Sequence, residues 1–386
     1  MTPAVIAGYV RTPFTFARKG PLANARPDDL AALVIGELVD RTGVPGHAIE
    51  DVIWGCAYPE GAQGDNIARV AGLLAGLPVQ VAGTTVNRFC GSSMYALHIA
   101  AGQIALGAGE AFVVGGVESM TMVPQGGLHP SLNPRFGNGD DGLNEFDFDA
   151  YVSMGQTAEN VAARYGVTRR EQESFALRSQ QKAAAAQNEG RLMEETVATR
   201  TSDGLLVEQD LCLRPATSLE GLAGLKPAFG DHGTVTAGTA SPLTDGAAAL
   251  LVTTEDFAAR HGLTVLARVL STAVAGCDPA FMGMGPVPAT QKALRRARLS
   301  VRDIDIIELN EAFASQAVAC IRELGLDPDR VNLDGGAIAL GHPLGATGAR
   351  ITGKAAQLLY RRKAQFALAT QCIGGGQGIA TILGAV

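Results

Sequence analysis

The chain has 386 residues, of which 47% are hydrophobic and 18% are charged, and its formal net charge is -7 at pH 7. This length favours two or three domains, and the acidic balance argues against non-specific nucleic-acid binding. Six scattered cysteines without a CxxC pair argue against a metal site and against a secreted disulfide framework. No signal peptide or membrane-spanning run is recognisable, so we expect a cytoplasmic enzyme without membrane contact.

The first third of the chain alternates apolar runs with amphipathic or small-residue segments. These patterns predict strands at residues 4–9, 51–56 and 110–117, and helices at residues 28–41 and 66–74. The run at 110–117 is continuously apolar, which is typical of a strand buried on both faces. The beginning of the chain therefore indicates an α/β fold.

Cys90 lies where a predicted strand ending at Val86 gives way to a predicted helix over residues 92–106. At a helix N-terminus, free backbone N–H groups and the helix dipole favour a thiolate over a thiol. We therefore expect Cys90 to be a nucleophile. The alternative is a buried structural cysteine at a tight turn.

The middle of the chain reads as an insertion. Residues 119–150 are rich in Gly, Pro, Asn and Asp, and they predict a long excursion. Two helices are predicted after it, at residues 154–163 and 169–190, the second with a capping box at its start. The insertion continues to about residue 238 and is rich in Arg and Lys, which form either a solvated surface or, for some of them, phosphate contacts.

The last third repeats the pattern of the first. Strands are predicted at residues 246–253, 304–309 and 365–371, and helices at residues 312–324 and 345–360. The repeated order of strand, glycine turn and helix indicates two similar βαβ halves.

Three C-terminal stretches carry side chains suited to acyl transfer. Asn310 and Glu311 directly follow a predicted strand, where open α/β sheets place ligands, although Asn310 could also cap the next helix. His342 lies in a glycine-rich run, and Cys372 leads into the glycine turn 374–376, whose N–H groups could stabilise an oxyanion. One thiolate would attack, an imidazole would take its proton, and a second thiol would shuttle another proton.

With these residues the chain resembles the thiolase family, of the acetyl-CoA C-acyltransferase (3-ketoacyl-CoA thiolase) type. The resemblance covers nearly all of the chain and rests on four motifs in order, namely residues 87–93 (NRFCGSS), 310–313 (NEAF), 336–345 (GAIALGHPLG) and 372–376 (CIGGG).

The resemblance implies a ping-pong mechanism. Cys90 would attack the keto carbon of a 3-ketoacyl-CoA, His342 would activate its thiol, and Cys372 would protonate the departing acetyl-CoA enolate. One oxyanion hole would combine His342 with a water held by Asn310. The other would use the backbone N–H groups of Cys90 and Gly374. CoA would then take the acyl group, so it is a substrate, and we expect no cofactor and no metal.

The same resemblance implies the architecture. The family fold has duplicated βαβαβ halves that form a five-layered αβαβα core, with an inserted loop domain over the site. We expect an N-terminal half of residues 1–118 plus 239–258, a loop domain of residues 119–238, and a C-terminal half of residues 259–386.

The resemblance also implies substrate contacts, from the loop domain and from both halves. Ser241 would contact the pantetheine arm, Met154 would line the acyl pocket, Phe313 belongs to the same binding region, and Arg214 is a candidate for the nucleotide end of CoA. Members specialised for acetoacetyl-CoA carry His where this chain has Ser153, and often Gly where it has Pro242. Both departures favour a degradative enzyme of fatty-acid β-oxidation that accepts longer chains.

Several alternatives remain open from the sequence. They are an acetoacetyl-CoA-specific biosynthetic thiolase, a carrier-protein condensing enzyme of the same fold, a cysteine hydrolase, and a non-catalytic acyl-CoA- or lipid-binding protein. By resemblance, the expected partners are CoA and acyl-CoA thioesters, in a homodimer or homotetramer that could join a hydratase/dehydrogenase subunit.

Overall fold

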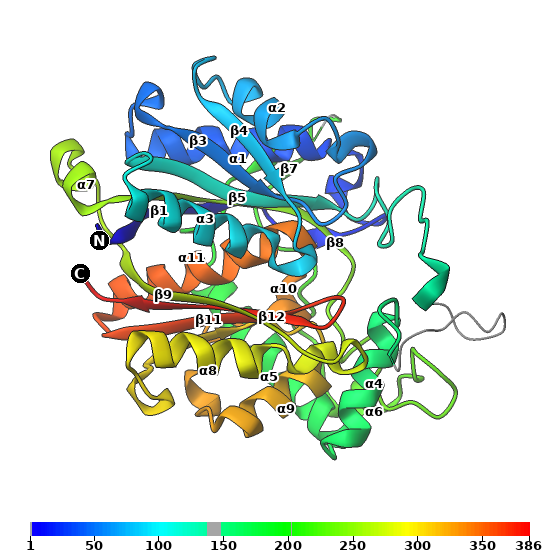
Figure 1. The fold of residues 1–386 in the computed structure, drawn as a ribbon. Helices are drawn as coiled ribbons and strands as arrows, with labels where there is room; N and C mark the ends of the chain where they lie inside the picture. The colour runs from blue at the N-terminus through cyan, green and yellow to red at the C-terminus, as the bar shows by residue number, and fades with distance from the viewer. Residues whose placement is uncertain (1, 137–147, 202) are drawn as a thin grey trace.

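The computed structural model describes residues 2–136, 148–201 and 203–386. Seen from the side, the molecule has five layers, with helices outside, two layers of strands within, and helices at the centre (Figure 1). Strands and helices of the N-terminal half form the upper layers, and those of the C-terminal half the lower ones. The predicted αβαβα architecture is confirmed.

The upper layers are built from the first 120 residues and from residues 244–261. Their strands are β1 (Ala4–Arg11), β2 (Thr15–Phe16), β3 (Asp51–Gly55), β4 (Ala82–Val86), β5 (Ala111–Ser119) and β8 (Thr244–Thr254). Their helices are α1 (Pro27–Thr42), α2 (Ile67–Leu74), α3 (Ser92–Leu106) and α7 (Glu255–His261). Helices α1 and α2 cover the outer face of this sheet through one hydrophobic cluster.

The lower layers are built from residues 267–384. Their strands are β9 (Ala267–Gly276), β10 (Ile306–Leu309), β11 (Phe366–Ile373) and β12 (Gln377–Gly384). Their helices are α8 (Pro286–Ala297), α9 (Ala314–Leu324), α10 (Ala337–Leu340) and α11 (Leu344–Arg362). Helices α8 and α9 cover the outer face, while α3 and α11 form the central layer between the two sets of strands.

The strand order follows one path, β10-β11-β12-β9-β1-β8-β5-β3-β4, and the two sets of strands meet where β1 pairs with β9 at only two positions. In the upper set, β4, β3 and β5 pair in parallel, and β8 pairs antiparallel with both β5 and β1. In the lower set, β10 and β11 pair in parallel, and β12 pairs antiparallel with both β11 and β9.

The two halves match even at their edges. Val331 forms a single parallel bridge to Ile307 of β10, in the place that β4 holds beside β3. The chain then runs from Val331 through the short helix α10 and a turn into α11, and in the upper set it runs from β4 through a turn into α3. The turn before α3 carries Cys90, and the turn before α11 carries His342.

Glycine lets the central helix touch the upper sheet with its backbone. A Cβ on Gly345 would lie 2.5 Å from the carbonyl oxygen of Val117 and 2.7 Å from that of Gly55. Any larger residue would push the start of α11 away from β3 and β5. The glycine-rich composition therefore fixes how deeply the His342 turn is seated.

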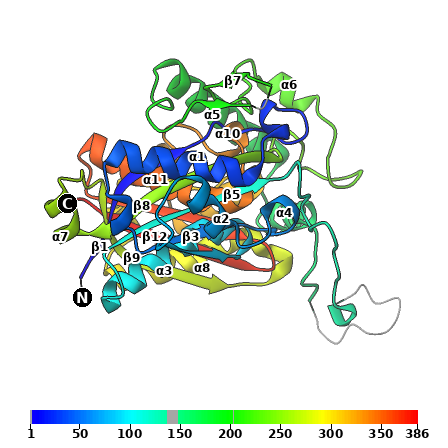
Figure 2. The same cartoon turned by 90° about the horizontal axis from the view of Figure 1, so that it is seen from above.

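The middle of the chain forms α4 (Met154–Arg164), α5 (Arg169–Asn188), α6 (Leu219–Ala223) and the short strand pair β6 (Thr199–Arg200) and β7 (Leu206–Val207). Before α4, the described chain extends away from the rest of the molecule (Figure 2). Part of the predicted excursion, residues 137–147, lies outside the described residues. The boundaries of the loop domain at 118 and 238 stay a prediction.

Most elements agree with the sequence patterns, and the differences have local causes. The helix at Ser92–Leu106 has the predicted bounds, and Thr168 and Glu171 form the predicted capping box. Strand β10 begins at Ile306, later than predicted, because a 3-10 turn at Val301–Asp303 precedes it. Elements that were not predicted from the sequence are β2, β6, β7, β9, β12, α6, α7, α8 and α10.

Candidate active site

Cys90 lies in a strained turn between β4 and α3. A 3-10 turn over Phe89–Gly91 carries it, and Phe89 has a φ of 43°, in the left-handed region that side chains rarely adopt. Asn87 Oδ1 accepts a hydrogen bond from Phe89 N at 2.8 Å, and Ser92 Oγ accepts one from Arg88 N at 2.9 Å. These side chains hold the turn in a shape that presents the sulfur at the start of α3.

The Cys90 thiol is not a thiolate at rest. Burial of its sulfur raises the pKa to about 11, and the Glu118 carboxylate also raises the pKa. Hydrogen bonds from the N–H groups of Gly374 and of Cys90 itself lower the pKa, but by less than burial raises it. The expectation that the helix terminus alone stabilises a thiolate at neutral pH is therefore wrong, because desolvation outweighs it. The thiol needs a base.

His342 has the protonation state of a base. Its pKa is lowered to about 3, first by burial and then by the Arg350 guanidinium, so the imidazole is neutral. The Thr347 hydroxyl donates to Pro343 O at 2.9 Å, which leaves its oxygen to accept the Nδ1–H of His342 at 2.6 Å. The lone pair of His342 then lies on Nε2.

Asn310 faces that nitrogen. Its side chain is fully buried, and Asn310 Nδ2 lies 3.4 Å from His342 Nε2. Helix α9 starts at Ala314 with Phe313 as its N-cap residue, so the alternative that Asn310 caps this helix is wrong. Asn310 Oδ1 is buried and has no hydrogen-bond partner among the described residues.

Cys372 is the second thiol of the site. It lies near the end of β11, is 1% exposed, and has a pKa raised well above the ordinary value by burial and then by the Cys90 sulfur. It therefore stays protonated. After Ile373 the chain turns through Gly374, Gly375 and Gly376 into β12, and the last two have φ of 76° and 80°, which favour glycine.

Three of the four residues predicted to contact substrate lie beside this site. Met154 and Phe313 pack in one cluster with Cys372, and the Met154 sulfur lies 3.6 Å from the position of a Cβ on Gly374. Ser241 N donates to Ala312 O at 2.9 Å, so it lies alongside the 310–313 segment. These contacts place the three residues around the Cys372 side of the site.

Arg214 is placed differently. Its guanidinium lies over the Phe16 ring at 5.0 Å from the centroid, and its backbone N–H donates to Gln180 Oε1 at 2.8 Å. Neither of these partners is a predicted site residue. Its predicted contact with the nucleotide end of CoA stays a prediction.

Four contacts at the site escaped the sequence reading. Thr244 Oγ1 accepts the His342 backbone N–H at 3.0 Å, and Thr347 Oγ1 accepts the Nδ1–H of the same residue. The Gln371 side-chain amide donates to Cys90 O, and the Glu118 carboxylate raises the pKa of the Cys90 thiol. The spacing of Thr347 five residues after His342, at the start of a helix, was the only signal for any of them.

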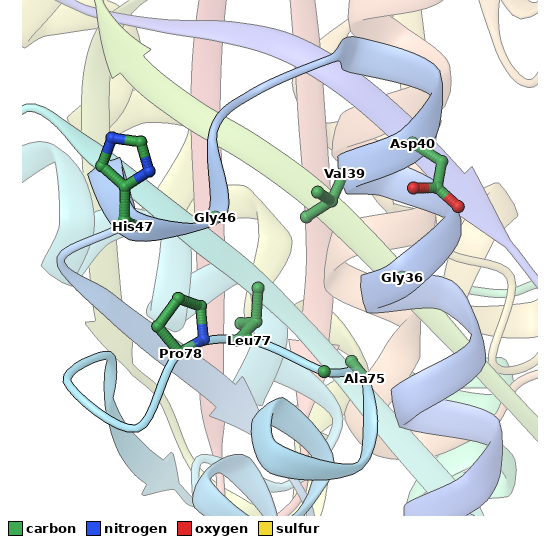
Figure 3. Close-up of a pocket in the computed structure, with 9 residues that line it drawn as sticks. Gly36, Val39, Asp40, Gly46, His47, Ala75, Leu77 and Pro78 are labelled. Atoms are coloured by element: carbon green, nitrogen blue, oxygen red, sulfur yellow. The ribbon is translucent and has the colours of Figure 1, made fainter.

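A hollow lies elsewhere in the described part of the protein. It has a volume of about 420 Å³ and lies between the end of α1 and the loop from α2 to β4, lined by Val39, Asp40, His47, Leu77 and Pro78 (Figure 3). None of the predicted site residues lines it. Within the described ranges, no group of three or more His, Cys, Asp or Glu residues could hold a metal ion, and no helix is long and apolar enough to span a membrane.

The arrangement has the parts of an acyl-transfer site. It combines a partly buried thiol in the turn before a helix, a neutral imidazole with an oriented lone pair, a second protonated thiol and a buried carboxamide. Such groups can form a thioester, stabilise an oxyanion and move protons without a metal.

Comparison with known proteins agrees with this site. The chain matches the family models for the thiolase N-terminal domain over residues 4–256 and for the thiolase C-terminal domain over residues 263–385. It is 49% identical to proteins named 3-ketoacyl-CoA thiolase from Shewanella frigidimarina and Shewanella loihica, and 48% identical to one from Shewanella sp. strain ANA-3. Each match covers 99% of both chains. This chain therefore belongs to the thiolase family.

Proposed function

We propose that this enzyme cleaves 3-ketoacyl-CoA with CoA, giving acetyl-CoA and an acyl-CoA shortened by two carbons. The reverse direction is a Claisen condensation through the same steps. Relatives named 3-ketoacyl-CoA thiolase across the full length support this substrate class. The observation that carries the proposal is the approach of the Cys90 turn to the end of β11, where the Gln371 side-chain amide donates to Cys90 O directly before a second, protonated thiol, Cys372.

The first half-reaction forms an acyl-enzyme. His342 Nε2 takes the Cys90 proton as the sulfur attacks the keto carbon, because neither group is charged at rest. A carbon–sulfur bond forms, and the oxyanion on the former keto oxygen is stabilised by the N–H groups of Cys90 and Gly374. The carbon–carbon bond then breaks, and Cys372 gives its proton to the acetyl-CoA enolate.

The second half-reaction returns the enzyme to rest. The Cys372 thiolate takes the proton of CoA, whose sulfur attacks the thioester carbon, and the carbon–sulfur bond to Cys90 breaks. Cys90 leaves as a thiolate and recovers its proton from His342. We assign the thioester oxygen of the enolate to the second oxyanion hole, formed by His342 Nε2 and a water held by Asn310. The 3.4 Å approach of Asn310 to His342 supports this assignment.

We propose a degradative, β-oxidation role over the acetoacetyl-CoA-specific one. Ser153 caps α4 by accepting a hydrogen bond from Gln156 N at 3.3 Å, directly before Met154. A small capping residue here, in place of an imidazole, leaves space beside Met154 for a longer acyl chain. Met154, Phe313 and Ser241 would line the acyl and pantetheine path, and Arg214 would meet the nucleotide end.

The proposal also covers the cofactor requirement, the assembly and the cellular location of the enzyme. CoA is a substrate, and no cofactor is required, because the two thiols, the imidazole and the carboxamide supply every proton transfer written above. We further propose a cytoplasmic homodimer or homotetramer, which could join a hydratase/dehydrogenase subunit in one degradative assembly.

The test is thiolysis of a series of 3-ketoacyl-CoA chain lengths, with and without CoA, followed by loss of the enolate absorbance. We expect CoA-dependent turnover at long and short chains, and at most one equivalent per active site without CoA. Turnover confined to acetoacetyl-CoA would leave the mechanism but refute the degradative role. Multiple turnover without CoA would instead support a cysteine hydrolase, and no reaction at all would support a binding protein.

A further inference from the structure

The segment that carries His342 runs from Gly336 to Gly345 and is called the His342 turn here. It is held at both ends by buried carboxylates that have no role in the mechanism above. At the start of the turn, Glu311 is 1% exposed. Its Oε2 accepts hydrogen bonds from Ile338 N at 3.2 Å and from the Ser179 hydroxyl at 2.6 Å, and its Oε1 accepts one from Asn332 Nδ2 at 2.8 Å. Glu311 thereby joins α5, the end of β10 and the first residues of α10.

At the end of the turn, Glu118 is fully buried near the end of β5. Its Oε2 accepts hydrogen bonds from Gly345 N and from Ala57 N, both at 2.8 Å. Its Oε1 accepts hydrogen bonds from Gln63 Nε2 at 2.9 Å and from Tyr58 N at 3.2 Å. Glu118 thereby joins the segment after β3 to the first turn of α11.

Burying these carboxylates costs free energy, which points to a purpose beyond packing. Each is held by neutral N–H and O–H donors, and burial raises the pKa of both Glu118 and Glu311. A well-packed apolar side chain would stabilise a fold at least as well as a buried charge. A carboxylate, however, can accept several directed hydrogen bonds at once and so fix separate segments relative to one another.

The backbone at the start of the turn is fitted to its carboxylate. A Cβ on Gly336 would overlap the Glu311 carboxyl group, with Oε2 only 2.5 Å away. The Gly336 N–H also donates to the same Ser179 hydroxyl, at 3.2 Å. The glycine therefore allows the carboxylate to lie directly against the chain that leads to His342.

Each carboxylate also leads to a different reacting group. Glu311 directly follows Asn310, whose side chain faces His342 Nε2. Glu118 holds Ala57, and Ala57 shares a small apolar cluster with Leu344 and Cys90. The two ends of the turn are thus tied to the carboxamide on one side and to the thiol on the other.

We propose that Glu118 and Glu311 are positioning residues that clamp the two ends of the His342 turn and so set the imidazole against Cys90 and Asn310. The inference rests on the proposed function, because it assigns the clamp to a base that takes the Cys90 proton. It adds two residues that touch neither substrate nor the reacting atoms.

The test shortens each clamp while keeping its charge. Glu118→Asp and Glu311→Asp remove one methylene, so the carboxylate can no longer reach both segments. The readout is the rate at which iodoacetamide alkylates Cys90 at pH 7.5, followed by intact mass and peptide mapping. The Cys90 sulfur attacks the methylene carbon, iodide leaves, and the thiol proton passes to His342 and then to solvent. We expect each variant to react roughly 10- to 100-fold more slowly, the loss typical of a misplaced catalytic group.

A double-mutant cycle separates positioning from general damage. In a His342→Ala background the same Asp variants should change the alkylation rate by less than about twofold, because the clamp then has no imidazole to place. Equal slowing with and without His342 would overturn the inference, as would an alkylation rate that His342→Ala leaves at the wild-type value. The matched control is Glu173→Asp on α5, a buried carboxylate ion-paired with Arg169, and it should react at the wild-type rate.

If an Asp variant does not fold, Ser179→Ala removes one donor to Glu311 and leaves the carboxylate in place. It should slow alkylation about 2- to 10-fold, the value of one hydrogen bond. An unchanged rate would count against the clamp. Alkylation needs no CoA, so its rate can be measured independently of turnover. Absence of CoA-dependent thiolysis by the wild type would refute the proposed function. If Glu118→Asp, Glu311→Asp and Ser179→Ala were all alkylated at the wild-type rate, only the clamp would be refuted.

Discussion

Replacing Thr347 by valine should leave the fold intact and disable the base. Valine has nearly the shape of threonine but lacks the hydroxyl oxygen that accepts His342 Nδ1–H at 2.6 Å. Thr347 is fully buried and His342 is 5% exposed, so no solvent replaces that acceptor. The proton then moves to Nε2, the nitrogen that must be free to take the Cys90 proton.

The size of the effect follows from the cost of a buried unpaired donor, about 1–3 kcal/mol. Since each 1.4 kcal/mol is a factor of ten, the active tautomer and kcat should fall roughly 5- to 150-fold, with KM unchanged. Steady-state thiolysis measures both constants, and Thr347→Ser, which keeps the hydroxyl, should stay close to wild type. A Thr347→Val enzyme with full kcat and wild-type thermal stability would refute the assigned tautomer.

Further predictions address the thiol, the glycines and the buried imidazole. Cys90→Ser should fold normally and lose essentially all turnover, because an alkoxide does not form at neutral pH; measurable thiolysis would contradict a Cys90 acyl-enzyme. In His342→Ala, where no imidazole can take the thiol proton, the rate of Cys90 alkylation should rise about tenfold per pH unit between pH 7 and 10, as a thiol pKa of about 11 requires, and a plateau near pH 8 would contradict that value. Gly336→Ala should lower the melting temperature and kcat because its Cβ overlaps Glu311, whereas Gly36→Ala, with open space in α1, should raise stability by about 0.5–1 kcal/mol; equal effects in thermal melts would refute the packing argument. The pKa of His342 is lowered from 6.5 to about 3 in the folded state, so between these pH values the unfolded chain binds one more proton than the folded chain. The free energy of unfolding should therefore fall as the pH drops below 6.5, by up to about 1.4 kcal/mol per pH unit for this group. Urea titrations at pH 6.5 and 5 should show a smaller loss for His342→Asn than for wild type.

The sequence was sufficient for many of the elements because these depend on local patterns. The helix at Ser92–Leu106 and the capping box at Thr168 are set by neighbouring residues, and the structure has them as predicted. The strands β9 and β12 were not predicted. They are antiparallel partners in the lower set of strands, and β9 also meets β1 of the upper set, so their pairing depends on long-range contacts more than on a local signal.

The electrostatics of the site were harder to predict than its residues. The sign of the Cys90 shift was wrong because it depends on how much protein surrounds the thiol, and Cys90 packs against Ala17 and Leu344, which are far away in sequence. The clamp escaped the sequence reading for the same reason. Glu118 and Gly345 are 227 positions apart, and no spacing rule relates them.

The matched turns before α3 and α11 have a consequence for how such a site could arise. If one half-length chain paired with a copy of itself, both turns would carry the same residue, and the pair could offer two thiols or two imidazoles but not one of each. Joining the halves in one polypeptide removes that constraint, since each turn can then change independently. The proposed nucleophile and its proposed base occupy equivalent places in the two halves, so the difference in their roles requires the fused chain.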